Sequence, residues 1–253
     1  MFSMNYLEEL VNTVKILRSP DGCPWDREQT HQSIRRNMLE EAYEAVEAID
    51  ENDMKHLKEE LGDVLLQVLL HSQIAADNNE FDIQDVAKML NDKLIHRHPH
   101  VFSNQKVNNS DDVVINWEKL KKEEKKERKK TLDGIVKSMP SLSVAEKISK
   151  KVVQKGFEWK NIDDVYNCFF SEVEEFRQAN NPEDKEMEFG DMLFSLVNLA
   201  RWEKIDPERA LSKSNNKFIK RFNKLEDIAE KPLDELSYEE YDNLWKKAKK
   251  LVD

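Results

Sequence analysis

Residues 39–63, LEEAYEAVEAIDENDMKHLKEELGD, decide the fold of this chain. The pattern is typical of two helices joined by a short polar turn. Glu41 and Glu44 lie three residues apart on the first helix, and Glu60 and Asp63 lie three apart on the second. Because residues three or four apart share a helix face, each helix presents a pair of carboxylates in one direction. The second pair leads into VLLQVLL, whose apolar residues on nearly every side predict a buried helix.

Carboxylates that converge in one pocket favour a bound cation, because neighbouring like charges oppose one another's ionisation. Oxygen ligands of this hard type suit Mg²⁺, with Mn²⁺ as the second choice, better than zinc or copper. The stretch alone also permits a plainer interpretation, in which the acids lie on solvated helix faces, since 36% of the residues are charged.

The composition predicts an all-α protein. The chain has 253 residues but only five Gly and seven Pro, which leaves few residues for turns. A net charge of −11 argues against binding to a nucleic acid duplex. The N-terminus has no signal-peptide pattern and no run of 18 apolar residues occurs, so we expect a cytoplasmic protein that does not span a membrane.

The second half of the chain repeats the first half in the same order. The matched segments are GCPW at 22–25 with GFEW at 156–159, LEEAYE at 39–44 with FSEVEE at 170–175, ELGDVLLQ at 60–67 with EFGDMLFS at 188–195, and NDKLIHR at 91–97 with NNKFIKR at 215–221. Trp117 with Lys121 likewise matches Trp245 with Lys249. A duplicated core accounts for repeated apolar positions, but less easily for repeated acids, bases and Trp. We therefore expect two repeats, residues 1–130 and 131–253, and a chemical role for the residues they share.

Several local signals predict helix starts and core positions. Ser143-x-x-Glu146 and Ser237-x-x-Glu240 fit the capping box, and Asp206-Pro207 predicts an N-cap followed by Pro in the first turn. The aromatic residues that we assign to the core, or for the two Trp to the core or the repeat junction, are Trp25, Trp159, Phe169, Phe170 and Phe176.

Taken together, CPWDREQTH, LEEAYE, ELGDVLLQ and RHPHVF, followed by the second EVEE and EFGD copies, resemble the MazG family of two-repeat nucleoside triphosphate pyrophosphohydrolases. The resemblance covers the chain from about residue 5 onward. It implies an all-α fold of two tandem four-helix-bundle repeats and a homodimer. It also implies an enzyme that hydrolyses an acid anhydride, converting a nucleoside triphosphate and water to the monophosphate and pyrophosphate with Mg²⁺.

The resemblance also implies roles for particular residues. The implied metal ligands of the first repeat are Glu41, Glu44, Glu60 and Asp63, and those of the second, which are also the implied catalytic set, are Glu172, Glu175, Glu188 and Asp191. The implied substrate-binding residues are Lys185, Lys217, Arg221, Trp245 and Lys249. Ser171 stands where the first repeat has Glu40, so either this first Glu is not a ligand or the second repeat binds metal more weakly.

We expect the second repeat to carry the activity, because His98-Pro99-His100 cuts the basic helix of the first repeat short. A carboxylate without metal, such as Glu41 or a neighbour, is a candidate to take the proton of the attacking water. The alternative function is a non-catalytic helical scaffold or regulator that binds a nucleotide or a protein partner. No residue of the sequence identifies the preferred base or sugar.

Overall fold

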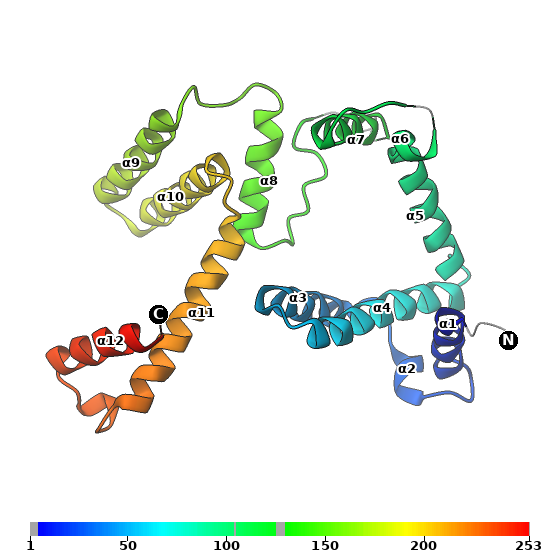
Figure 1. The fold of residues 1–253 in the computed structure, drawn as a ribbon, viewed down its shortest axis with the longest axis horizontal. Helices are drawn as coiled ribbons and strands as arrows, with labels where there is room; N and C mark the ends of the chain where they lie inside the picture. The colour runs from blue at the N-terminus through cyan, green and yellow to red at the C-terminus, as the bar shows by residue number, and fades with distance from the viewer. Residues whose placement is uncertain (1–4, 104, 125–129, 253) are drawn as a thin grey trace. The chain divides into compact units, whose positions relative to one another are not determined.

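The structure is a computed structural model that describes residues 5–103, 105–124 and 130–252 (Figure 1). All regular secondary structure among these residues is helical, which confirms the prediction of an all-α protein. The chain divides into two compact units, Met1–Glu124 and Lys125–Asp253. None of the described helices is both long enough and apolar enough to cross a membrane.

The first unit is built around a long helix hairpin. Its helices are α1 (Tyr6–Leu17), α2 (Pro24–Glu28), α3 (Arg35–Glu51), α4 (Met54–Asp77), α5 (Ile83–Arg97), α6 (Pro99–Phe102) and α7 (Ser110–Glu124). α3 and α4 lie side by side, and α1 packs on α4 (Figure 1). The core joins Val14 of α1 and Ile34, which precedes α3, to Leu69, Leu70 and Ile74 of α4. α5 leaves the end of α4, and α7 packs on α5.

The second unit has a similar order of helices. These are α8 (Ser141–Val153), α9 (Ile162–Gln178), α10 (Pro182–Trp202), α11 (Pro207–Ile228), the short 3-10 helix η1 (Leu233–Glu235) and α12 (Tyr238–Val252). α9 and α10 lie side by side and α8 packs on α10, where buried Ser149 donates a 2.6 Å hydrogen bond to Asn198. α11 leads away from this group and α12 returns along it (Figure 1).

Two of the three predicted helix starts are confirmed. Asp206 accepts a hydrogen bond from the backbone N–H of Arg209, and Ser237 and Glu240 form the reciprocal bonds of a capping box. The bonds to Ser237, together with the hydrogen bond from Lys231, lower the pKa of Glu240 to about 2. The prediction for Ser143 is wrong, because α8 already begins at Ser141. Ser143 instead donates from its backbone and its hydroxyl to Glu208 of α11.

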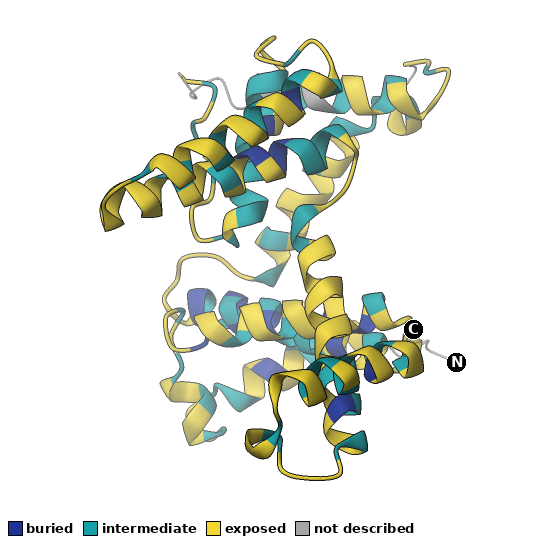
Figure 2. Ribbon diagram, turned by 90° about the vertical axis from the view of Figure 1, so that its left-hand side faces the viewer, coloured by how far each residue is buried: buried dark blue, intermediate teal, exposed yellow. Residues whose placement is uncertain are grey.

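Two of the aromatic residues for which we predicted a core position, or for Trp25 a core or repeat-junction position, are exposed within their own units. Trp25 is exposed on α2, and Phe170 is exposed on α9 although it contacts the rings of Tyr166 and Phe169. The reason is geometric. Each of the long hairpins has neighbours on only part of its surface, so buried residues are confined to short stretches of the packed faces (Figure 2). The described residues of each unit leave apolar side chains on the opposite face uncovered.

The loop before α3 is held to α4 by two contacts that the sequence pattern did not reveal. The Arg18 guanidinium, whose side chain is only 7% exposed, forms a 2.8 Å ion pair with Asp77 and donates to the carbonyl oxygens of Asp26 and Gln29. Nδ1 of His31 lies 2.8 Å from Nδ1 of His71, and the two rings are stacked. Burial, followed by the charge of His31, lowers the pKa of His71. These contacts fix the start of the helix that carries Glu41.

Candidate active site

The first unit contains a group of three carboxylates on the facing helices α3 and α4. Glu41, Glu60 and Asp63 each offer an oxygen atom, and these atoms all lie within 4.8 Å of one another. Glu60 is buried, and its Oε2 has no hydrogen-bond partner among the described residues. Its Oε1 lies 2.9 Å from Nε2 of His56, one helical turn earlier. His56 is a neighbour of the site that the motif comparison did not single out.

The second unit contains the matching group on α9 and α10. Glu172, Glu188 and Asp191 again bring three carboxylate oxygens within 4.8 Å of one another. This group is more open than the first, because Asp191 is exposed whereas every member of the first group is at least partly buried. Position 184, which corresponds to His56 by the spacing of the repeats, holds Asp184, so this group has another acid in place of an imidazole.

Two glutamates in each group have a pKa above the usual value of a carboxyl group. Burial, followed by the charges of Asp63 and Glu44, raises the pKa of Glu41, and burial and Glu44 raise that of Glu60 despite the opposing effect of His56. In the second group, burial and the charge of Glu175 raise the pKa of both Glu172 and Glu188. The cause is the same in each unit, since negative charges are gathered where water is partly excluded.

Glu44 and Glu175 lie beside these groups, but neither belongs to the set of three close oxygens. Glu175 accepts a 3.0 Å hydrogen bond from the hydroxyl of Ser171. In the first unit Glu40, which stands where Ser171 stands in the second, instead forms a 2.8 Å ion pair with Arg36. The geometry therefore favours the first of our two alternatives: the first Glu of LEEAYE lies outside the metal group, so Ser171 costs the second group no ligand.

The structure places the expected substrate-binding residues on two different parts of the second unit. Lys185 lies on α10, one turn before Glu188, and is exposed. Lys217 and Arg221 share a face of α11, while Trp245 and Lys249 share a face of α12. Trp245 packs against Phe218, with ring centroids 5.2 Å apart. These four residues lie on a hairpin that extends away from the helices of the acid group (Figure 1).

The donor set of each group fits a hard divalent cation. Three carboxylate oxygens lie close together, two pKa values in each group are raised, and one buried oxygen of Glu60 lacks a partner. A divalent cation would remove the mutual repulsion that raises these pKa values and would supply a partner for that oxygen. The acids bring no sulfur ligand within the set, which suits Mg²⁺ or Mn²⁺ better than a softer metal.

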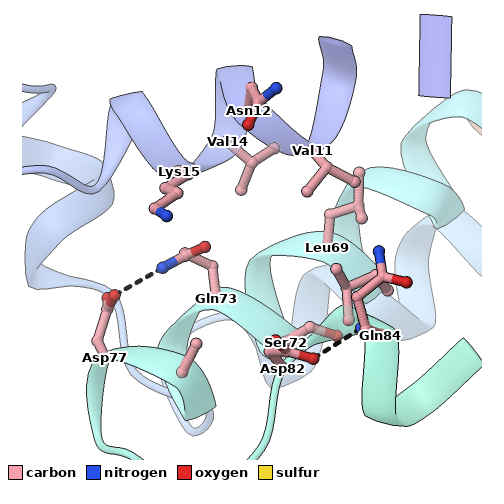
Figure 3. Close-up of a pocket in the computed structure, with 12 residues that line it drawn as sticks. Val11, Asn12, Val14, Lys15, Leu69, Ser72, Gln73, Asp77, Asp82 and Gln84 are labelled. Atoms are coloured by element: carbon pink, nitrogen blue, oxygen red, sulfur yellow. Dashed lines mark hydrogen bonds between the residues drawn. The ribbon is translucent and has the colours of Figure 1, made fainter. Parts of the chain in front are cut away.

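A pocket of about 420 Å³ lies elsewhere in the first unit (Figure 3). It is bounded by α1, α4 and the start of α5, and its lining includes Lys15, Gln73 and Asp77. The side chain of Gln73 donates a 2.8 Å hydrogen bond to Asp77 at its edge. None of the carboxylates of either acid group lines this pocket, so it is separate from the candidate site.

Comparison with known proteins identifies the family. Residues 29–102, which include α3, α4 and α5, match the MazG nucleotide pyrophosphohydrolase domain. The chain is also 46% identical over 246 residues to the nucleoside triphosphate pyrophosphohydrolase/pyrophosphatase MazG of Thermotoga maritima, covering 96% of this chain and 95% of that protein. The chain belongs to the MazG family. It is 41% identical to the nucleoside triphosphate pyrophosphohydrolase of Escherichia coli K12 over 89% of each chain. An uncharacterized Bacillus subtilis protein, YabN, is 46% identical over 93% of this chain and 50% of its own length.

The MazG domain match contains Glu41, Glu44, Glu60 and Asp63 and thus the whole first acid group. The relatives from Thermotoga maritima and Escherichia coli extend over both units. Membership in the family therefore confirms the sequence-based assignment, while the role of each individual residue stays a prediction.

Proposed function

We propose that this protein is a Mg²⁺-dependent nucleoside triphosphate pyrophosphohydrolase that releases pyrophosphate and a nucleoside monophosphate. The observation that carries the proposal is the pair of carboxylate groups on facing helices, in a chain whose full-length relatives are named for this activity. In the reaction the oxygen of water attacks the α-phosphorus, the bond from that phosphorus to the bridging oxygen breaks, and pyrophosphate leaves.

The second unit carries the reaction in this proposal. Glu172, Glu188 and Asp191 would hold Mg²⁺, which would supply positive charge to the phosphate oxygens. Glu175 lies beside the three ligands and accepts a hydrogen bond from Ser171, which orients it. We therefore assign to Glu175 the role of general base, which accepts the proton of the attacking water. The exposed side of this group at Asp191 leaves room for a triphosphate, whereas Glu60 of the first group is buried and engaged by His56.

The basic and aromatic residues complete the site. Lys185, on the same helix as Glu188, is positioned to neutralise a phosphate. Lys217, Arg221 and Lys249 supply further cations, with the planar guanidinium best suited to two phosphate oxygens at once. Trp245 offers an indole face on which any base can stack, which does not select among bases. All of these residues except Lys185 lie on the α11–α12 hairpin. We propose that the α11–α12 hairpin of a second copy brings them to the acid group.

A direct product assay tests the activity. The purified protein is incubated with each of the common ribo- and deoxyribonucleoside triphosphates and Mg²⁺, and products are separated by ion-exchange chromatography. We expect monophosphate and pyrophosphate in equal amounts, and no product above background when a chelator removes the metal. Diphosphate with inorganic phosphate would contradict cleavage at the α-phosphorus. No metal-dependent product from any substrate would favour the alternative, a scaffold or regulator that binds without turnover.

We further propose that the protein is a homodimer whose copies cover the open faces of the acid-bearing hairpins. Leu61 on α4 is 55% exposed, and Phe189, at the matching position of α10, is 49% exposed. Each directly follows a carboxylate of its metal group, Glu60 or Glu188. Further exposed apolar residues on the same two hairpins are Leu39, Tyr43, Val46, Ile49, Phe170, Met187, Leu193 and Leu196. Burying such faces between two copies removes apolar area from water on both sides.

Replacing Leu61 and Phe189 together with Asp is expected to convert the dimer to a monomer. Two charges per copy would then have to be buried in the interface without partners. Light scattering after size-exclusion chromatography at micromolar concentration measures the change. Gln154→Glu, a nearly isosteric change at an exposed position directly after α8 and outside both hairpins, adds the same kind of charge and should leave the dimer intact. A monomeric wild-type protein would contradict the proposed assembly.

A further inference from the structure

A histidine contacts one carboxylate of the first acid group. His56 and Glu60 lie one turn apart on α4, and Nε2 of His56 is 2.9 Å from Oε1 of Glu60. An ionised carboxylate can only accept a hydrogen bond, so the imidazole is the donor. The side chain of Glu60 is only 8% exposed, whereas that of His56 is 38% exposed. The contact therefore holds a buried acid from the solvent side of the helix.

The other oxygen of Glu60 points to a missing partner. Oε2 is buried and has no hydrogen-bond partner among the described residues. The same carboxylate belongs to the group in which oxygens of Glu41, Glu60 and Asp63 lie within 4.8 Å of one another. A buried charged oxygen without a partner is costly, and neighbouring carboxylates add to that cost. A divalent cation held by the three acids would compensate it.

The second unit differs at the position of the histidine. Asp184 of α10 corresponds to His56 and lies one turn before Glu188. Its side chain accepts a 2.6 Å hydrogen bond from the amide of Asn181. An ionised carboxylate has no N–H to donate to Glu188 and carries the same charge. The two groups therefore share their three acids, but only the first has an imidazole that anchors one of them.

We propose that His56 is a positioning residue that holds Oε1 of Glu60 and leaves Oε2 for a divalent cation, so that the first group binds its cation more tightly than the second group does. This inference rests on the metal binding of the proposed function and assigns the difference between the groups to one residue. Partners that orient a metal-ligating side chain change metal affinity by about 10- to 100-fold. The cation of the first group would join Glu41 of α3 to Glu60 and Asp63 of α4 and thereby fasten the two helices together.

Titration of the full-length protein with Mn²⁺, without nucleotide, tests this inference. Electron paramagnetic resonance of the free ion measures how much Mn²⁺ is bound at each step. We expect a tight and a weak class of sites in the wild-type protein. Asp63→Asn should abolish the tight class, and Asp191→Asn should abolish the weak class, which assigns each class to its group. A single class of equal sites, or loss of the tight class in Asp191→Asn, would overturn the inference.

Variants of His56 test its positioning role. His56→Ala should weaken the tight class by about tenfold or more and leave the weak class unchanged. His56→Gln keeps an N–H donor close to the place of Nε2 and should retain most of the affinity, which a role in packing alone would not explain. Lys55→Ala shortens the exposed side chain of the preceding residue and should bind as the wild type does. Wild-type affinity in His56→Ala, or an equal loss in both variants of His56, would contradict the inference.

The second unit provides the converse test, which stays decisive if His56→Ala does not fold. Asp184→His places an imidazole one turn before Glu188 and should tighten the weak class by about tenfold. Asp184→Asn removes the same charge, but its shorter side chain does not place a donor where Nε2 of an imidazole lies, so it should tighten binding much less. Equal affinities in these two variants would overturn the inference and, in a protein that hydrolyses triphosphates with Mg²⁺, leave the proposed function standing. A wild-type protein that binds neither Mn²⁺ nor Mg²⁺ would instead overturn the metal dependence of the proposed function.

Discussion

Asp191→Asn is expected to lower the rate of nucleoside triphosphate hydrolysis by about 100-fold or more, since a catalytic metal contributes several kcal/mol to the reaction. Asp191 is the one exposed acid of its group, and we propose that the triphosphate binds on this side. Asn keeps the shape of the side chain but removes one ligand charge. The substitution should not unfold the protein, because it relieves part of the repulsion that raises the pKa of Glu172 and Glu188.

Two control variants test whether the loss of activity is specific to the acid group of the second unit. Glu174→Gln, on α9, removes an exposed acid whose contacts are with Arg177 and Gln178, and it should leave the rate nearly unchanged. Asp63→Asn makes the equivalent change in the first unit and should cost much less activity than Asp191→Asn. The measurement is steady-state hydrolysis with saturating Mg²⁺. If Asp63→Asn abolished turnover and Asp191→Asn did not, the assignment of the two units would be reversed.

The sequence predicted the helices and the acid groups well because both depend on local spacing. Glu60 and Asp63 share a helix face whatever surrounds them, and both lie on α4, which continues through the apolar run VLLQVLL as predicted. The pairing of α3 with α4 then follows from a turn of very few residues. The same reasoning placed Asp206 and Ser237 at helix starts, where the deciding contacts lie within three residues.

The contacts that the sequence did not reveal join residues far apart in the chain. His31 meets His71, Arg18 meets Asp77, and Arg97 meets Glu124, and no periodicity links the members of these pairs. The charged run KLKKEEKKERKK at 119–130 has no sequence pattern that predicts such a contact. Glu124 within it is bound to Arg97, while residues 125–129 lie outside the part that the structure describes. Ser143 failed as a cap for the same reason, since its partner Glu208 is remote in sequence.

Exposed aromatic residues mark another limit of pattern reasoning. Phe170 has the apolar character of a core residue, but burial depends on what covers a helix face, and the described residues of its own unit leave this one exposed. The sequence identifies an apolar helix face but does not show which element covers it. Under the proposed dimer, the face would be covered by a second copy, so the assignment of Phe170 to an interior would hold for the assembly and fail for the single chain.

Mg²⁺ is expected to raise the melting temperature at pH 7.5 by an amount on the order of 10 °C when its free concentration is about 100 times the Kd. Binding to the folded state alone adds about 2.7 kcal/mol per site under that condition, and each kcal/mol shifts the melting temperature of a domain of this size by several degrees. The physical reason lies in the acid groups, where Glu41, Glu60, Glu172 and Glu188 have raised pKa values. Whenever these carboxylates are ionised they repel one another, and a cation between them removes that repulsion.

The pH dependence of this shift follows from the same pKa values. A carboxyl group whose pKa is higher in the folded protein than in the unfolded chain binds more protons when folded, so the stability of the metal-free protein falls as the pH rises from about 4.5 through the raised pKa. Protons and Mg²⁺ compete for the same oxygens, and the shift caused by Mg²⁺ should therefore be much smaller at pH 5 than at pH 7.5. Differential scanning calorimetry with and without a chelator measures the stability of the metal-free protein and the shift caused by Mg²⁺ at each pH.

Replacing Glu60 and Glu188 together with Gln should raise the melting temperature of the metal-free protein, because each group loses one repelling charge. The same change should remove most of the response to Mg²⁺, because each group loses one ligand. Glu174→Gln should keep the full response. A melting temperature that Mg²⁺ leaves unchanged at pH 7.5 would show that these acids tolerate their mutual repulsion without a cation, and the metal assignment of both groups would fall.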